Sequence, residues 1–433
     1  MFDKLKKFPF PTPFDLALFL SLVSVFWAVI MTRPEEQSIG YYTWEVLGFW
    51  KDGFWGLLEF TLQMVLILVF GHVLAISKPI SLLLDRIASY VHNNTQAVLM
   101  TGSVTMLAGY FNWGFGLILG AVLARKVGEV SLSKGFKVNY PLVVASGYLG
   151  MMIWHGGLSG SAPLKVAEHG HFLEAEMGVI PIGETIMSPF NIWINLVLIL
   201  VLILTLWGLS KRKVTFYRLD NLKEEVRLDG KDKLGWVVGV LLCLLALGDL
   251  LSTSGNGLAF INLNYINFLL FGLGLVFHGS LRNYVRATES AVKGATGIIL
   301  QFPFYAGILG VFKTSGLLVL IADYFVNISS PETFPLLAFI SAGLINLFVP
   351  SGGGQWAVQG PVIIETATKM GLSLPKMVMV MAYGDQLTNM LQPFWALPLL
   401  AISGLAPKEL LRYTLYFFLV GGLVFGFGIF LAF

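Results

Sequence analysis

The residues most able to do chemistry lie in polar interruptions of an otherwise apolar chain. One carboxylate, Asp385, stands in the run Gly384-Asp-Gln-Leu-Thr-Asn389 inside a long apolar segment. A carboxylate within a membrane segment is energetically costly and is usually functional. Its neighbours carry oxygen atoms, the ligands that hard cations prefer. We therefore expect ion coupling, by Na⁺ or a carried proton, at Asp385, Gln386, Thr388 and Asn389, with Na⁺ ligands at Asp385, Thr388 and Asn389. A structural hydrogen-bond acceptor is the alternative.

A second interruption contains a histidine. The run Trp154-His-Gly-Gly-Leu-Ser-Gly-Ser161 places His155 in a break of the first half that corresponds to the break around Asp385. The unperturbed imidazole pKa of about 6.5 suits a side chain that relays a proton or holds a carboxylate. A histidine that only caps a broken helix is an equally good interpretation.

A third interruption consists of three consecutive glycines. Gly352, Gly353 and Gly354 follow Pro350 and Ser351 between two apolar segments. Each glycine costs about 1 kcal/mol relative to alanine inside a helix, so we predict that regular helix breaks here. A break at membrane depth must be buried or line a cavity, which predicts the tip of a re-entrant hairpin. Its amides, at a helix N-terminus, attract an anion. A tight helix crossing is the alternative.

These breaks and the tip of an earlier hairpin supply the expected substrate site. Its residues are Ser351, Gly352, Gly353, Gly354, Gln355, His155, Gly156, Gly157, Ser159, Ser161 and Asn112. We identify no cationic side chain in the breaks, and a dicarboxylate or tricarboxylate ordinarily requires one. A monoanion with an apolar tail is therefore the easier fit. The tail would contact the aromatic residues Phe111, Trp113, Trp154 and Trp356, each of which is equally a candidate for packing.

The composition of the chain indicates the class of protein to which these residues belong. The chain has 433 residues, of which 56% are hydrophobic and 12% charged, whereas about a quarter of a soluble domain is charged. Apolar runs of about 20 residues predict an all-α polytopic protein in a lipid bilayer. The net charge of +3 gives no reason to expect a nucleic-acid partner. Walker A and His-Glu-x-x-His motifs are absent, so we expect no enzyme and no cofactor beyond the coupling Na⁺ or H⁺.

About nine transmembrane helices and two re-entrant hairpins are predicted. The spans are 14–32, 54–77, 140–167, 189–210, 236–252, 258–279, 294–326, 376–401 and 408–431. The segment 33–53 is expected to be a loop, and 80–92 and 280–293 are expected to be amphipathic helices at the membrane interface. We expect 294–326, which contains Pro303, to form one tilted or kinked span, and the sequence leaves a broken pair as the alternative.

Two repeat halves organise the predicted helices. They are 1–210, with a hairpin at 95–127 and a broken helix at 140–167, and 236–433, with a hairpin at 333–370 and a broken helix at 376–401. The linker 211–235 carries eight Lys or Arg residues, which places it and the N-terminus in the cytoplasm and the C-terminus outside. Short arms around 109–116 cannot span the membrane. The hairpins are expected to enter from opposite faces, as in inverted-repeat carriers.

Two motifs resemble the short-chain fatty acid transporter family, Trp154–Ser161 and Pro350-Ser-Gly-Gly-Gly-Gln-Trp-Ala-Val-Gln-Gly-Pro361. The resemblance covers nearly the whole chain and implies an inverted repeat of the ion transporter superfamily, an elevator-type mechanism and a homodimer. It also implies symport of small monocarboxylates such as butyrate and acetoacetate across the cell inner membrane. Members of the superfamily place Ser-Asn-Thr motifs at Na⁺ sites in both halves. Here only Thr388-Asn389 comes close, and Trp154-His155 stands in the first half instead.

The sequence therefore predicts a secondary active transporter that takes up short-chain fatty acids or other small monocarboxylates with H⁺ or Na⁺. A carrier of dicarboxylates or other organic anions is the alternative within transport. An intramembrane enzyme would need an acid–base pair across the two halves, and His155 and Asp385 are the candidates for it. A carrier moves its substrate unchanged, whereas an enzyme converts it.

Overall fold

Helices account for the regular structure of the protein. The computed structural model describes residues 13–212, 232–252, 261–347, 349, 351–392 and 395–433, and these residues contain no strand. The expectations for residues 1–12 and for 213–231 of the linker lie outside the described residues. The all-α class is as predicted, because a helix satisfies its own backbone hydrogen bonds wherever apolar surroundings supply no partner.

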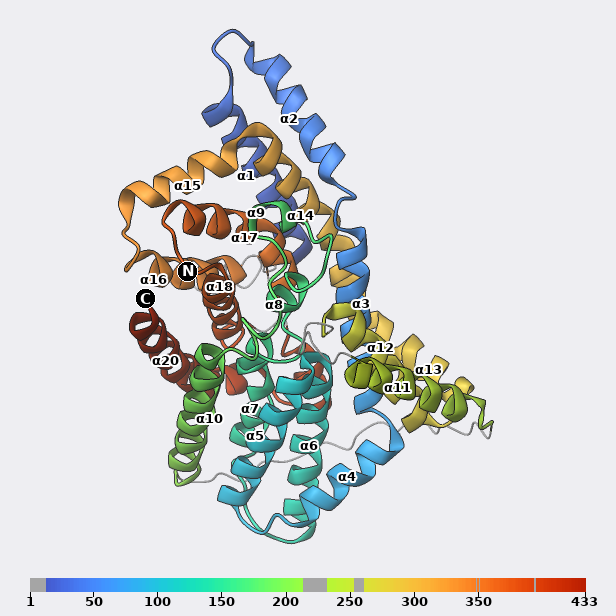
Figure 1. Ribbon diagram of the computed structural model, residues 1–433. Helices are drawn as coiled ribbons and strands as arrows, with labels where there is room; N and C mark the ends of the chain where they lie inside the picture. The colour runs from blue at the N-terminus through green and yellow to red at the C-terminus, as the bar shows by residue number, and fades with distance from the viewer. Residues whose placement is uncertain (1–12, 213–231, 253–260, 348, 350, 393–394) are drawn as a thin grey trace, which may run out of the picture.

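The described chain begins with two helices that project at the top of Figure 1. They are α1 (Pro13–Thr32) and α2 (Ile39–Gly53), and both contact α14. The prediction of a loop over 33–53 is therefore wrong for most of its length. Ser38 starts α2 by accepting a hydrogen bond from the Tyr41 amide at 3.3 Å, which is the usual role of serine at a helix N-cap.

The next four helices end in a hairpin that lies in the lower part of Figure 1. They are α3 (Leu58–Ala75), α4 (Lys78–Ser89), α5 (Asn94–Phe111) and α6 (Trp113–Ser133). The expectation of short arms is wrong, since α5 has 18 residues and α6 has 21, with Asn112 alone between them. The Asn112 side-chain oxygen accepts the Phe115 amide at 2.7 Å and so starts α6 at once.

A series of short helices follows α6. They are α7 (Tyr140–Ser146), η2 (Leu149–Met152), η3 (Trp154–Gly156), α8 (Ser161–Lys165) and α9 (Glu174–Met177), and α10 (Pro189–Ser210) comes next. Close packing on α5 explains one of the breaks. The Leu158 amide donates to the Tyr110 carbonyl at 2.7 Å, and a Cβ on Gly157 would lie 2.3 Å from that carbonyl oxygen. Only glycine permits such a close approach of two backbones.

The second half contains the remaining helices. They are α11 (Leu234–Ser252), α12 (Leu263–His278), α13 (Leu281–Val292), η4 (Lys293–Ala295), α14 (Thr296–Ser315), α15 (Leu317–Ile328), α16 (Phe334–Asn346), α17 (Gly352–Lys369), α18 (Leu374–Thr388), α19 (Leu397–Ser403) and α20 (Pro407–Ala432). The expectation of one span over 294–326 is wrong. Gly316, at a φ of +80°, separates α14 from α15, and α15 turns away from α14 in Figure 1. Pro303 lies inside α14 without ending it.

Two of the predicted helix breaks do not occur at the residues where we expected them. The three glycines form the first turn of α17, so the prediction that they interrupt helical structure is wrong. Similarly, α18 continues through Gly384 and Asp385 to Thr388, and its break begins only there. Tertiary packing overrides weak helix propensity in both places, because all residues from Gly352 to Ile364 and from Met377 to Thr388 are buried.

Several helices have the length and composition of membrane spans. In the described residues, four are long and apolar enough to cross a bilayer: Leu58–Ala75, Pro189–Ser210, Leu281–Ser315 and Pro407–Ala432. Shorter apolar helices lie at Ala17–Thr32, Leu234–Gly248, Leu263–His278, Leu317–Ile328 and Phe334–Asn346. These helices support a multi-pass membrane protein. The count of nine spans and the inverted repeat stay predictions.

The helices that position the site meet at the middle of the molecule. α8, α17 and α18 contact one another there, and η3 contacts both α8 and α18 (Figure 1). Because α17 and α18 are buried on every side over most of their length, neither has a polar face turned to water. Residues from the two halves of the chain therefore share one interior.

Candidate functional site

The two titratable residues singled out in the sequence are in direct contact. Nδ1 of His155 lies 2.7 Å from Oδ2 of Asp385, and the two side chains are only 0% and 1% exposed. His155 comes from η3 and Asp385 from α18, 230 positions away in the chain. A buried carboxylate is stabilised by a hydrogen-bonded partner of this kind, so the pair meets the requirement for keeping Asp385 inside the protein.

Backbone contacts decide which nitrogen of His155 carries hydrogen. The Ala162 amide donates to Nε2 at 3.3 Å, so Nε2 is the acceptor and Nδ1 donates to Asp385. The His155 amide in turn donates to Oε1 of Gln386 at 3.0 Å. Among the described residues, Oδ1 of Asp385 has no hydrogen-bond partner. This oxygen is therefore a buried acceptor that no described group uses.

The glycine-rich start of α17 lies against this pair. A Cβ on Gly352 would lie 2.7 Å from His155 Cε1, 2.7 Å from Trp154 Cη2 and 3.2 Å from Asp385 Oδ2. Ser351 caps the helix by accepting the Gly354 amide at 3.3 Å. The first amides of a helix have no preceding carbonyl to bond and attract negative charge. The absence of a side chain at Gly352 thus keeps these amides accessible beside the His155–Asp385 pair.

A small pocket opens at the same place. Its polar lining consists of Ser161, Ser351 and Gly352, and its apolar lining of Met64, Trp113, Met151, Trp154, Ile298 and Trp395. No charged side chain of the described residues lines it. The pocket therefore combines a short polar end with aromatic and thioether walls, which is the usual composition of a site for a small amphiphilic ligand.

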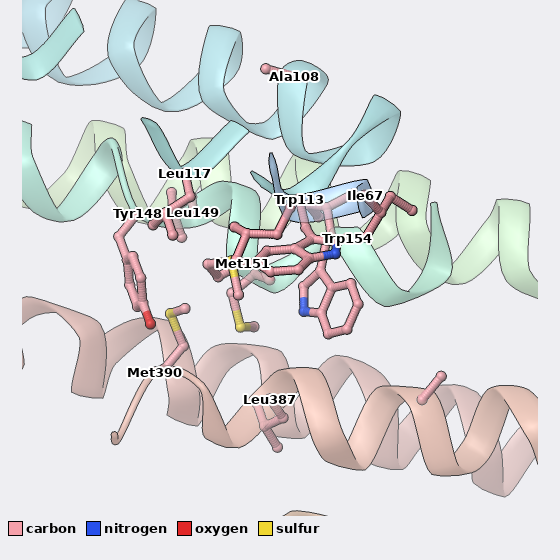
Figure 2. Packing of buried hydrophobic residues seen from close by; sticks show 14 of the residues in the cluster. Ile67, Ala108, Trp113, Leu117, Tyr148, Leu149, Met151, Trp154, Leu387 and Met390 are labelled. Atoms are coloured by element: carbon pink, nitrogen blue, oxygen red, sulfur yellow. The ribbon is translucent and has the colours of Figure 1, made fainter. Parts of the chain in front are cut away.

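Aromatic stacking fixes the pocket walls. The Trp154 ring stacks on His155 with centroids 4.2 Å apart and an interplanar angle of 15°. Trp113 contacts both Trp154 and Trp395, with ring centroids 5.9 Å and 4.9 Å away. Figure 2 shows the two indoles of Trp113 and Trp154 lying together beside Met151. The wall residue Trp154 is therefore in direct contact with His155.

The other predicted substrate residues have structural partners. Asn112 donates to the Ile67 carbonyl at 3.4 Å, and Ser159 Oγ accepts the Trp113 amide at 2.9 Å. Gln355 donates to the Ala342 carbonyl and to Gln359, both at 2.8 Å. Glycines at the site pack against neighbouring side chains: Gly156 against Asn191 and Asn195, Gly353 against Phe60 and Met64, and Gly354 against Tyr305. Most of the predicted substrate residues therefore make contacts that shape the site.

The expected Na⁺ ligands do not gather on the Asp385 carboxylate. Instead, Nδ2 of Asn346 donates to three oxygens, the Asp385 carbonyl at 2.7 Å, Thr388 Oγ1 at 3.0 Å and Asn389 Oδ1 at 3.1 Å. Gln392 also donates to Asn389 Oδ1, at 3.0 Å. The amide nitrogen of Asn346 therefore lies within 3.1 Å of all three oxygens. Asn346 was not a predicted site residue, and no sequence signal distinguishes it.

One buried cation was overlooked by the sequence analysis. Lys165, at the end of α8, is 5% exposed, and its ammonium lies 2.7 Å from the Glu168 carboxylate and 3.2 Å from the side-chain oxygen Oε1 of Gln63. Lys165 lies beyond the run Trp154–Ser161, so it does not contradict the expectation that the breaks contain no cationic side chain. The charge is neutralised, however, because Glu168 is buried beside it and also accepts from Gln63 at 3.1 Å.

Comparison with known sequences identifies related proteins. The model of the short chain fatty acid transporter family matches residues 3–432. A relative from Escherichia coli (strain K12), named as a short-chain fatty acid transporter, is 37% identical, and the match covers 97% of this chain and 96% of the relative. A relative from Haemophilus influenzae with the same name is 35% identical, with coverage of 94% and 92%.

Solved structures of the same fold are transporters. The Alcanivorax borkumensis YdaH transporter matches with a TM-score of 0.62 at 16% identity, over 97% of this chain and 98% of that one. MtrF of Neisseria gonorrhoeae, described with a class of antimetabolite efflux pumps, matches with a TM-score of 0.56 at 15% identity, over 98% and 95%. At this identity the likeness concerns the fold. Family and structural neighbours are transporters or efflux pumps and not enzymes, which excludes the enzyme alternative. The chain belongs to the short-chain fatty acid transporter family.

Proposed function

We propose that this protein is a secondary active carrier that takes up short-chain monocarboxylates together with protons. The observation that carries the proposal is the uncharged pocket beside the buried His155–Asp385 pair. The pocket offers one polar end for a carboxylate, formed by Ser161, Ser351 and the start of α17. Its apolar walls suit a short hydrocarbon tail.

The lining favours one carboxylate over two. A second carboxylate would have to be buried against Met64, Met151 and Ile298, and a charge without a partner is strongly disfavoured there. Lys165 lies in α8 one helical turn beyond Ser161, but its charge is already matched by Glu168 at 2.7 Å. We therefore prefer a monocarboxylate of the butyrate or acetoacetate type to a dicarboxylate.

Electrostatics link the substrate to the proton. A carboxylate bound at the Gly352 amide would lie close to Asp385, because Oδ2 of Asp385 is 3.2 Å from the Cβ position of Gly352. Two like charges about 4 Å apart repel by about 4 kcal/mol at an effective dielectric constant of about 20. Protonation of the pair, at the free Oδ1, removes the repulsion. Substrate and proton would then bind together and leave together, which is symport.

Sodium coupling is the competing scheme. It would use the oxygens of Asp385, Thr388 and Asn389 around Asn346. In that case the Asn346 amide would have to turn its oxygen toward the ion. The proton scheme needs no such rearrangement, and we prefer it for that reason.

Uptake into proteoliposomes tests the function. Radiolabelled acetate, butyrate, acetoacetate and succinate would be supplied under separate inward pH and Na⁺ gradients. Because neutral butyric acid crosses bilayers unaided, the measured quantity is the difference from protein-free liposomes, supported by counterflow at equal pH. We expect counterflow of butyrate and acetoacetate, and accumulation driven by the pH gradient. Accumulation driven by Na⁺ alone would replace the proton scheme, and counterflow of succinate without butyrate would overturn the monocarboxylate proposal.

A further inference from the structure

We propose that the indole N–H groups of Trp113 and Trp154 are the hydrogen-bond donors that hold the carboxylate of the substrate. The inference rests on the proposed function and assigns to these residues a polar role, whereas the sequence suggests only apolar contact with the substrate tail. Both residues line the pocket, from two different elements, α6 and η3.

Both donors are buried and unused. Nε1 of Trp113 and Nε1 of Trp154 have no hydrogen-bond partner among the described residues, although the side chains are only 5% and 4% exposed. Buried N–H groups are nearly always hydrogen-bonded, and an orphaned one needs an explanation. An indole has one donor and no acceptor, so its missing partner must be an acceptor. Two such donors in one pocket indicate that the pocket receives an acceptor-rich group.

The position of the indoles indicates a carboxylate. The two rings lie together in Figure 2, with centroids 5.9 Å apart. Cη2 of Trp154 is 2.7 Å from the Cβ position of Gly352, so this ring lies against the first turn of α17. Gly352 at the start of α17, the two serines Ser161 and Ser351, and the two indoles therefore line one pocket. A carboxylate, with two oxygens and about four acceptor positions, can use several of them at once.

The stack on His155 gives the arrangement a further consequence. Trp154 lies flat on the imidazole at 4.2 Å, and the imidazole bonds Asp385. The indole that binds the carboxylate is thereby held in place by the proposed proton site. The substrate carboxylate and the proton would then bind to side chains that are in direct contact with one another.

Phenylalanine substitution separates the donor from the ring. W113F and W154F keep an aromatic wall and remove one N–H group each. We expect the KM for butyrate counterflow to rise about tenfold or more in each variant, as for loss of a hydrogen bond to a charged group. The matched control is W50F, because Nε1 of Trp50 is also buried without a partner but lies in α2, outside the pocket. Its KM should equal that of the parent.

A direct measurement keeps the test decisive if a variant folds poorly. In the parent labelled with ¹⁵N at the indole nitrogens, titration with butyrate should shift the N–H resonances of Trp113 and Trp154 and leave that of Trp50 in place. Unchanged KM in W113F and W154F, or resonances that do not move while butyrate binds, would overturn the inference. A parent that neither binds nor exchanges butyrate would instead overturn the proposed function.

Discussion

At the scale of single residues, the contact between His155 and Asp385 explains how a carboxylate stays buried. Each side chain alone would be an unpaired polar group within the apolar interior, where the free-energy cost is high. Together they form one hydrogen-bonded unit at 2.7 Å with a free carboxylate oxygen. Both side chains of the unit are shielded from water, at 0% and 1% exposure.

We predict that Asp385→Asn abolishes proton-driven accumulation and preserves exchange. Asparagine keeps the shape of the side chain but has no carboxylate to protonate, so the pair no longer carries a charge that the proton can cancel. Pre-loaded proteoliposomes should still exchange labelled butyrate, while accumulation under a pH gradient should fall to the level of protein-free liposomes. Asp323→Asn is the control, since this exposed acid pairs with Lys369 on the surface. Parental accumulation by Asp385→Asn would make Asp385 structural.

We predict that Gly352→Ala eliminates transport. The new methyl group would lie 2.7 Å from both His155 and Trp154, where neither stacked ring can give way easily. Counterflow of butyrate should be at least about a hundredfold slower, because displacing catalytic geometry by about 1 Å commonly has that effect. Gly426→Ala in α20 is the matched control, since a Cβ there meets nothing within 4 Å. Equal rates in the two variants would show that contact at Gly352 is unimportant.

At the scale of elements, the breaks bring helix ends into the interior and expose polar backbone there. α8 ends at Lys165 beside Glu168, and Gln63 of α3 bonds both of their charged groups. Asn264 of α12 accepts from the same Gln63 amide at 3.0 Å. The network therefore links the broken segment of the first half to α3 and α12. A buried ion pair of this kind is chiefly sensitive to losing one partner.

We predict that Lys165→Met lowers stability by about 3–5 kcal/mol, because it leaves Glu168 buried without its counter-charge. Lys165→Met combined with Glu168→Leu should be more stable than Lys165→Met alone. Thermal unfolding in detergent measures the order of the midpoints. Lys369→Met is the control, because its surface pair with Asp323 is 30% and 53% exposed and is worth at most about 1 kcal/mol. A midpoint for Lys165→Met equal to that of the parent would contradict the role of the network.

At the scale of the whole molecule, elements of the two halves lie around one centre. The α5–α6 hairpin extends downward from that centre in Figure 1, and α17 lies above it. The arrangement is compatible with hairpins that enter from opposite faces of a bilayer, as the inverted repeat requires. In an elevator-type carrier we would expect these central elements to move together against the outer helices.

We predict that the open ends of the two hairpins face opposite sides of the membrane. Ser133→Cys at the end of α6 and Thr368→Cys near the end of α17 are exposed positions for labelling. Cys243, the single native cysteine, would first be replaced by alanine. A membrane-impermeant maleimide should label Ser133→Cys from the cytoplasmic side and Thr368→Cys from outside. Labelling of both positions from the same side would refute the inverted repeat.

Sequence alone determined the class of the protein and its most unusual residues. Long apolar runs imply membrane helices, because only helices satisfy the backbone in lipid within one segment. Asp385 and His155 could be found because polar groups are rare and costly in such runs. The starts of α6 and α17 are likewise set by the local sequence, because the side chains of Asn112 and Ser351 each accept a backbone amide of the following turn.

Only the tertiary structure decided which of these residues meet. The contact of His155 with Asp385 joins positions 230 residues apart, and local propensity carries no information about such a distance. The three glycines are helical because surrounding rings bury them, an effect larger than their intrinsic cost of about 1 kcal/mol each. Asn346 and Lys165 were missed for the same reason: an asparagine or lysine becomes a site residue through what packs around it.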